Sequence, residues 1–426
     1  MSAQSLESVI RSIRELLRRA GWVRHLALGA YLRAINRRPE AARSLPDLGS
    51  FARVLIVRLD EIGDFVLTTP LLRAVRHSFP GLHVSLLVSS KVMALAYDCP
   101  YVDEVIPFDI VRAPRPFDQV VSLMRARAFA KRRLAGGKYQ CALVPRADID
   151  NAGAAAMSHY AGIPVRIGYS ERVLPLKAIK NAGYDGFLTH AVAALHGRHE
   201  VQWSLNLALL AGAKTDDTRL ELWPGEALRA SVAARLERFK GGRGFLVALA
   251  PGANLDRRQW PASRFAAVAR TIIRQRGAKV VIVGGADDVA LAERLAAEAG
   301  CAESILDLTG KLSLGETASL LAQCRLFIGN DSGPMHIAAA MGAPCVEISC
   351  HPKDGDALAA NSPARFSPWG IASTVLQPER ATHPCVDSCS KSEAHCIRQI
   401  GVEEVLLAAC RLLDGGFALA DRKIEA

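Results

Sequence analysis

The chain has few aromatic residues, no long apolar run and no glycine fingerprint of a dinucleotide-binding domain. Phe, Trp and Tyr make up only 6% of its 426 residues, and no nucleic-acid-binding motif accompanies them, so stacking on bases is not favoured. No stretch is apolar over the length that a bilayer requires. The pattern G-x-G-x-x-G is absent, which disfavours a nicotinamide dehydrogenase.

A secretory signal is also missing, because the first twenty residues have no unbroken apolar stretch and are interrupted by Glu7, Arg11, Arg14, Glu15, Arg18 and Arg19. Ten cysteines are present, and six of them are scattered, mostly in apolar surroundings, as expected for small core residues in a reducing compartment. We therefore expect a cytoplasmic protein.

What the chain does have is size, apolar content and positive charge. Its length suggests two or three domains, and half of its residues are hydrophobic, enough for a sizeable core. The formal net charge is +11. This excess favours an acidic partner, such as a phosphorylated substrate or an anionic membrane surface.

Residues 1–49 differ from the rest of the chain. Apolar residues recur at helical spacing between Leu6 and Leu17, and a second helical stretch runs from Leu26 to Ile35. The segment contains nine arginines and four acidic residues. A basic amphipathic extension of this kind either lies on an anionic membrane or packs on the protein's own surface, and both interpretations stay open.

From residue 50 onward, β-branched runs alternate with helical patterns, which predicts mostly parallel sheets. In the first half we expect strands at 54–57, 83–88, 104–107 and 140–144, with helices at 68–78, 92–96 and 117–134. After Gly241-Gly242 the rhythm restarts, with strands at 245–250, 279–283, 304–308, 326–328 and 344–348 and helices at 264–276, 289–299, 314–324 and 334–341.

This rhythm predicts two doubly wound domains. We expect an N-terminal domain at 50–225, a C-terminal domain at 226–405, and a final helix and tail at 406–426. Two such domains leave a cleft between them, because sheets of this kind bind ligands beyond the carboxyl ends of their strands.

Asp64 is the first candidate for chemistry. It follows Gly63, which permits a sharp turn, at the end of the first strand and the start of the next helix. At a cleft mouth its carboxylate can act as a general base. The plain alternative is that Asp64 only caps the helix.

The second candidate segment opens the C-terminal domain. A strand leads to Gly252 and Asn254, and a basic pair, Arg257 and Arg258, comes just before the next helix. Cations beside a glycine turn suit a diphosphate, with Arg258 as the preferred ligand and Arg257 as the second. A solvated basic loop is the alternative.

The third candidate is the octapeptide at 330–337, which follows a short apolar run. Ser332 can cap a helix, and Pro334 suits its first turn. Free N–H groups at a helix start favour an anion, Asp331 can accept from hydroxyls, and His336 adds a ring donor. The mixture suits a nucleotide sugar, and the alternative is a capped core helix.

These motifs, in this order, make the chain similar to glycosyltransferase family 9, the ADP-heptose:lipopolysaccharide heptosyltransferases. The resemblance spans roughly residues 52–405. The segments that carry it are 54–80 with Gly63-Asp64 and Thr68-Thr69-Pro70, 139–144, 166–169, His199-Glu200-Val201, 251–261 and 329–340.

The resemblance implies a GT-B fold of two Rossmann-like domains and an inverting reaction that requires no metal. It implies that Asp64 is the catalytic base, that Arg258 replaces a phosphate-binding lysine, and that the donor nucleotide lies against the C-terminal domain. Donor-binding residues are then expected at Gly252, Asn254, Arg257, Arg258, Asp331, Ser332, Gly333 and His336. The chain departs from the family at Ala253, where a hydroxyl is expected, and at Asp60-Glu61, where many members have serines.

A basic stretch at 111–138 holds eight Lys or Arg residues against Asp118 alone. Such a surface attracts a phosphorylated lipopolysaccharide core, or it is simply a solvated helix face. On the acceptor side we expect Gly63, Thr68, Arg125 and Arg132.

Three cysteines, Cys385, Cys389 and Cys396, lie close together near the end of the C-terminal domain, with Cys350, His383 and His395 as possible partners. Three or four such ligands can hold structural zinc or iron. Free thiols are the alternative, since the spacing is looser than in a paired C-x2-C site.

The sequence thus predicts a heptosyltransferase-like enzyme of lipopolysaccharide assembly that uses ADP-heptose at the cytoplasmic membrane face, with no nucleic-acid partner. Three alternatives remain: the same fold with another nucleotide sugar, a non-catalytic sugar-nucleotide-binding scaffold, and a protein-directed heptosyltransferase with a cysteine metal site.

Overall fold

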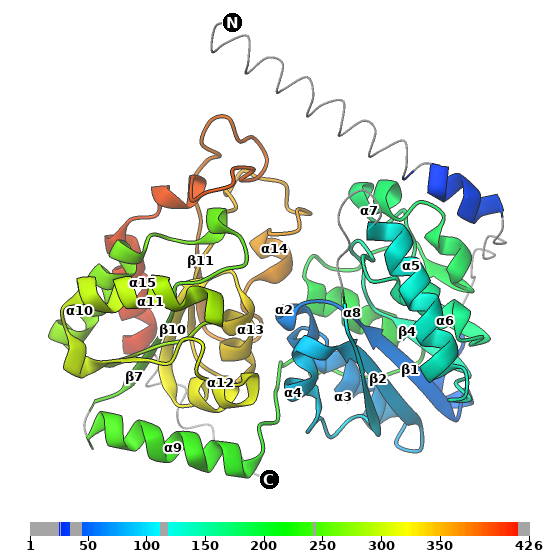
Figure 1. The fold of residues 1–426 in the computed structure, drawn as a ribbon, viewed down its shortest axis with the longest axis horizontal. Coiled ribbons are helices and arrows are strands. Elements are labelled where there is room, and N and C mark those ends of the chain that lie inside the picture. Colours follow the sequence, from blue (N-terminus) through cyan, green and yellow to red (C-terminus); the bar gives the residue numbers. More distant parts are fainter. Residues whose placement is uncertain (1–24, 26, 35–44, 111–117, 242–243, 416–426) are drawn as a thin grey trace, which may run out of the picture.

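The computed structural model describes residues 25, 27–34, 45–110, 118–241 and 244–415. They form two α/β halves that lie side by side, the N-terminal one blue to green and the C-terminal one green through yellow to red (Figure 1). This is the GT-B arrangement that the sequence predicts.

The N-terminal half is built on a six-stranded parallel sheet in the order β3-β2-β1-β4-β5-β6. Its central strand β1 pairs with β2 on one side and β4 on the other, so that Val54 aligns with Val84 and Cys141. The strands are β1 Arg53–Arg58, β2 His83–Ser89, β3 Glu104–Phe108, β4 Cys141–Val144, β5 Val165–Tyr169 and β6 His190–Val192.

The C-terminal half repeats this order in its own parallel sheet, β12-β11-β10-β7-β8-β9. In both halves the strand order reverses at the first strand, and ligands of doubly wound sheets bind at that switch point. The strands are β7 Leu246–Ala250, β8 Lys279–Ile282, β9 Ile305–Asp307, β10 Cys324–Asn330, β11 Cys345–Ile348 and β12 Ser373–Leu376.

Helices cover both faces of each sheet. The N-terminal half carries α2 Ile62–Val66, α3 Thr69–Ser78, α4 Met93–Ala96, α5 Asp118–Phe129, α6 Ala154–Tyr160, α7 Pro175–Lys180 and α8 Glu200–Leu210. The C-terminal half carries α9 Glu226–Lys240, α10 Ala262–Arg276, α11 Val289–Ala299, α12 Leu314–Leu321, α13 Gly333–Ala340, α14 Pro363–Phe366 and α15 Val402–Gly415. Short 3-10 turns (η) and one π-helical turn, η3 Ala130–Leu134, complete them.

Alternating side chains of the strands pack into different apolar cores. Val54 and Ile56 of β1, together with Ala248 of β7, belong to one continuous apolar cluster that spans both halves. Leu55 lies in a separate cluster on the outer face of the first sheet. The shared cluster joins the halves along the side where their helices α2, α4, α12 and α13 meet.

The strands and helices expected from the sequence in both halves are all present, but the structure adds elements that the pattern did not reveal. Strands β5, β6 and β12 were not predicted. β6 has three half-buried residues and β12 is mostly half-exposed, so neither shows the buried run of a central strand. The predicted helix at 314–324 ends earlier, because Cys324 already begins β10.

Only part of the N-terminal extension is described. Residues 27–34 are helical, and Leu32, 2% exposed, packs beside Tyr184 and Phe187. This part packs on the protein's own surface, whereas the predicted helix at 6–17 lies outside the described residues. Among the helices in the described part of the chain, none combines the length and apolarity needed to cross a membrane.

Candidate active site

The two halves touch through the short helix α2 and the start of α13. The His336 ring on α13 lies against Gly63 of α2, and its Nε2 is 2.8 Å from where a β-carbon on Gly63 would fall. In the same way, the Cβ of Ile62 is 3.2 Å from where a β-carbon on Gly333 would fall. The two segments that the sequence singled out are therefore in direct contact across the domain boundary (Figure 1).

Asp64 lies in this contact region with its carboxylate held on both oxygens. Oδ1 accepts from Nη2 of Arg58 at 2.9 Å, and Oδ2 accepts from the backbone N–H of Glu61 at 3.2 Å. The second bond places Asp64 at the third position of α2 in a capping arrangement. The helix-capping role and the catalytic role suggested by the sequence are thus compatible in one side chain.

A buried charge network surrounds Arg58, a residue that sequence reasoning missed. Its side chain has no exposed surface, and besides Asp64 it contacts Asp60, whose Oδ2 lies 3.0 Å from Nε. Asp60 also pairs with Arg146. Burial raises the pKa of Asp60 to about 6, although the two arginines oppose this shift. An arginine at the last position of a buried strand was the available signal.

Among the residues expected to bind the donor, Arg258 and Asp331 form an ion pair. Arg258 Nη1 also lies 3.3 Å from Asn254 Oδ1, so three of the expected donor residues converge. Arg257 is the neighbouring residue of the same short turn η5 (Asp256–Arg258). The Arg258 guanidinium, beside the carboxyl ends of β7 and β10, can face a diphosphate.

The start of α13 presents polar atoms that lack protein partners. Among the residues that the structure describes, Ser332 Oγ and His336 Nδ1 are buried without a hydrogen bond. Burial lowers the pKa of His336, which favours the neutral ring. Buried polar atoms normally have partners, so these two are suited to a ligand.

The structure corrects the expected cap by Ser332. This residue occupies the N-cap position of α13, but its side chain makes no capping bond. A capping side chain bonds to the second or third N–H of the helix. Pro334 has no N–H, and the N–H of Met335 bonds to the Ser332 carbonyl at 3.1 Å. The hydroxyl therefore stays available.

Two further side chains shape this region: Asn330, which begins the octapeptide singled out from the sequence but had no role assigned, and Asp288, which the sequence analysis missed. The Asn330 amide donates to the Pro251 carbonyl at 2.7 Å and accepts from the Trp260 N–H at 3.1 Å, which ties the loops after β7 and β10 together. Asp288 lies where a β-carbon on Gly252 would fall. Gly252 is therefore required for this close approach.

Glu347 is a buried acid within β11, 1% exposed, with no hydrogen bond to its carboxylate among the described residues. Burial, followed by the nearby Asp331 carboxylate, raises its pKa well above the ordinary value, whereas Arg258 opposes the shift. An acidic residue inside a run of buried strand residues was the signal for it.

The expected acceptor-side residues do not all converge. Thr68 is fully buried and donates to the Asp64 carbonyl at 2.8 Å, so it supports the backbone that carries Asp64. Arg125 lies on α5 and Arg132 on the following turn η3, which pack with α6 away from α2 (Figure 1). Arg112 and Arg115 of the basic stretch lie outside the described residues.

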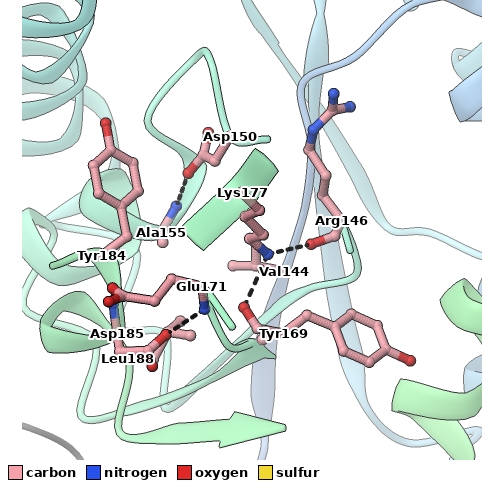
Figure 2. A pocket seen from close by; sticks show the side chains of 11 residues that line it. Val144, Arg146, Asp150, Ala155, Tyr169, Glu171, Lys177, Tyr184, Asp185 and Leu188 are labelled. Carbon is pink, nitrogen blue, oxygen red and sulfur yellow. Dashed lines mark hydrogen bonds between the residues drawn. The ribbon is translucent and has the colours of Figure 1, made fainter. Parts of the chain in front are cut away.

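A small cavity of about 20 Å³ lies behind Arg146, with room for about one or two water molecules. Figure 2 shows Lys177 there, 4% exposed, donating to the carbonyls of Arg146 at 3.3 Å and Tyr169 at 3.0 Å. Burial lowers the pKa of Lys177 to about 8. Lys177 thus ties together the chain segments that follow β4 and end β5, and it fixes the backbone from which Arg146 reaches Asp60.

The cysteine cluster is only partly as expected. Cys385, Cys389 and Cys396 come together with His395, and their ligand atoms all lie within 4.8 Å of one another. His395 takes the fourth place in this group, and Cys350 is not part of it. Its thiol instead accepts from the Asn361 amide at 3.4 Å. Three thiols and one imidazole match the donor set of a tetrahedral zinc or iron site.

Comparison with known proteins identifies the family. The family model described as glycosyltransferase family 9 (heptosyltransferase) matches residues 127–395. The chain is 24% identical over 296 residues to lipopolysaccharide heptosyltransferase 3 of Escherichia coli K12, which covers 67% of this chain and 79% of that protein.

Two solved structures share the fold. A glycosyl transferase family 9 protein from Veillonella parvula superposes with a TM-score of 0.68 at 22% identity, covering 88% of this chain and all of that chain. The E. coli ADP-heptose lps heptosyltransferase II superposes with a TM-score of 0.64 at 20% identity, covering 86% and 99%.

Proposed function

The chain belongs to glycosyltransferase family 9, and we propose that it transfers heptose from ADP-heptose to a lipopolysaccharide core or a related glycan, with inversion and without a catalytic metal. The observation that carries this proposal is the contact of α2 with α13. His336 of α13 lies against Gly63, the residue before Asp64, and the charges of Asp331, Asp64 and Arg258 all act on the pKa of its ring. The proposed proton acceptor, Asp64, and the proposed diphosphate site at Arg258 then lie on either side of the contact between α2 and α13.

In the proposed reaction, Asp64 accepts the proton of an acceptor hydroxyl as its oxygen attacks the anomeric carbon. The bond to the donor diphosphate breaks, and displacement from the opposite face inverts the configuration. Charge that develops on the leaving diphosphate is stabilised by Arg258 and by the start of α13, where Ser332 Oγ is free to donate. These fixed groups supply the stabilisation that a metal gives elsewhere.

ADP-heptose is proposed as the donor because relatives named as heptosyltransferases match much of the chain. Asp331 and Ser332 can hold the ribose and diphosphate, and Arg258 neutralises part of the phosphate charge. Replacement of lysine by arginine keeps the charge and adds a planar pair of donors. An anionic acceptor fits the basic exterior around Arg132, an exposed residue.

We also propose that the cluster of Cys385, Cys389, His395 and Cys396 holds a structural zinc or iron ion. A bound ion would fix the loop around residues 385–396, away from the proposed proton transfer at Asp64. For the whole protein we propose a place at the cytoplasmic face of the inner membrane, supported by its positive charge and by the lipopolysaccharide-directed relatives.

A binding and turnover experiment tests the proposal. The protein is titrated by calorimetry with ADP-heptose, a UDP-sugar and a GDP-sugar, and release of ADP is then followed with a lipopolysaccharide core acceptor. Tight binding of ADP-heptose with ADP release supports heptose transfer. Preference for another nucleotide sugar contradicts it and favours the same fold with that donor. Binding of ADP-heptose without ADP release, whichever acceptor is added, contradicts it and favours the scaffold interpretation.

A further inference from the structure

Arg365 joins the two halves of the molecule at a buried position. It lies on α14 in the C-terminal half, and its Nη2 donates to Glu200 Oε1 at 2.5 Å and Asp148 Oδ2 at 2.8 Å in the N-terminal half. Its side chain is 1% exposed, and its Cζ is 4.9 Å from the centroid of the Trp203 ring. Two carboxylates and an aromatic face therefore fix this guanidinium.

Glu200 connects Arg365 with the proposed base. Its other oxygen, Oε2, lies 3.9 Å from Nη2 of Arg58. The same nitrogen donates to Asp64 Oδ1 at 2.9 Å. Two carboxylates thus face one donor, and the side chains of Arg58 and Glu200 are 0% and 2% exposed, so water screens this competition poorly.

We propose that Arg365 is a positioning residue for Asp64: by pairing with Glu200 across the domain boundary, it leaves the Arg58 guanidinium bound to Asp64. This inference rests on the proposed function of Asp64 as the base. It adds that a side chain of the C-terminal half, whose hydrogen bonds go to Leu358, Asp148 and Glu200, sets the geometry of the proposed catalytic carboxylate in the N-terminal half.

The variant Arg365→Met tests the first consequence. Without Arg365, the buried Glu200 carboxylate has Arg58 as its nearest cation, at 3.9 Å. We therefore expect Nη2 of Arg58 to move from Asp64 toward Glu200. We expect kcat to fall by up to about 100-fold, the usual cost of a misplacement of about 1 Å. The Kd for ADP should stay unchanged, because Arg365 makes none of the donor-side contacts described above.

The double variant Glu200→Gln/Arg365→Met separates positioning from simple domain docking. The neutral amide that replaces the Glu200 carboxylate would no longer compete for Arg58, so kcat should recover at least about tenfold over Arg365→Met, even though the interdomain ion pair is still missing. If Arg365 served only to dock the domains, the double variant would be no more active than Arg365→Met. That outcome would overturn the inference.

A matched control removes another interdomain contact. Trp369 donates through Nε1 to the Thr218 carbonyl at 3.0 Å, and Trp369→Phe loses that bond while it leaves the charge network intact. We expect its kcat to stay within about threefold of wild type. A loss equal to that of Arg365→Met would mean that any weakened domain contact reduces turnover, and it would contradict the proposal.

Crystal structures keep this test independent of the proposed function. If the wild-type protein releases no ADP from ADP-heptose, the proposed function fails. The positioning inference is then decided by the structure of Arg365→Met alone. Arg58 Nη2 bonded to Glu200 supports it, and Arg58 still bonded to Asp64 overturns it.

Discussion

The imidazole of His336 occupies the space beside Gly63 where any side chain larger than hydrogen would project. Replacing Gly63 by Ala would therefore push α2 and α13 apart, or force the ring to move, and Asp64 is the next residue along α2. We expect Gly63→Ala to lower kcat/KM by about 10- to 100-fold, measured as ADP release.

Gly81→Ala is the matched control, because a β-carbon on Gly81 meets nothing within 4 Å. It should keep wild-type turnover and melting temperature. Wild-type activity of Gly63→Ala would show that the close contact of α2 with α13 is not needed for the reaction.

Arg258 and Asp331 form a partly buried pair with side chains 16% and 8% exposed. Arg258→Ala removes the cation and leaves the Asp331 carboxylate to repel the diphosphate. We expect calorimetry to show a Kd for ADP raised by about 30-fold or more, or ~2 kcal/mol. The Kd for ADP of Arg258→Lys should lie between those of the wild type and Arg258→Ala. Arg276→Ala, which removes a surface pair with Asp414, should bind ADP as wild type does.

The sequence predicts the two sheets and the segments that meet between them, because central strands are continuous buried runs and because Gly63, Arg258 and Asp331 each follow such a strand. It does not predict β6 or β12, which lie at sheet edges and have few buried residues. It also assigns no role to Arg58, Glu200 or Arg365. Their partners lie up to 217 positions away, and only the folded chain brings them together.

Local chemistry explains two differences between the expected and the observed site. Ser332 has the residue type of a cap, yet the proline two positions later removes one of the N–H groups that a cap needs. Cys350 has the residue type of a metal ligand, but it follows β11, and the nearer His395 completes the cluster instead. Residue type and spacing predicted a candidate, and the backbone decided which atoms are close.

His199 gives the domain contact a dependence on pH. Its Nε2 donates to the Ser367 carbonyl at 3.0 Å, its Nδ1 accepts from the Val201 N–H at 3.3 Å, and its ring stacks on Trp369 at 4.5 Å. Both bonds together require the neutral ring. Burial lowers the pKa of His199 from 6.5 to about 4, although the bond to Ser367 opposes this.

The unfolded chain therefore takes up a proton at His199 between about pH 6.5 and 4, whereas the folded chain does not. The contribution to stability is complete above about pH 6.5 and is lost as the pH falls through this window, by on the order of 3 kcal/mol. Urea unfolding of wild type and His199→Phe at about pH 7.5 and 4.5 checks this prediction. The loss on acidification should be smaller in His199→Phe, and an equal loss would assign it to other groups.

The cysteine cluster predicts metal content that depends on four particular residues. Protein purified without a histidine tag should contain about one zinc or iron per chain by mass spectrometry. Cys389→Ser should lose the metal and melt at a lower temperature. Cys350→Ser, the matched control outside the cluster, should keep it. Equal metal content in both variants, or no metal in wild type, would leave free thiols as the answer.

Single turnover of ADP-heptose by wild type and Asp64→Asn tests the central claim most directly, with Asp414→Asn as a surface control. Loss of a general base should reduce the rate by about 10²- to 10⁴-fold. Asp64→Asn should still bind ADP with wild-type affinity, and the wild-type product should have the inverted anomeric configuration. A near-normal rate for Asp64→Asn, or a product with retained configuration, would contradict the account.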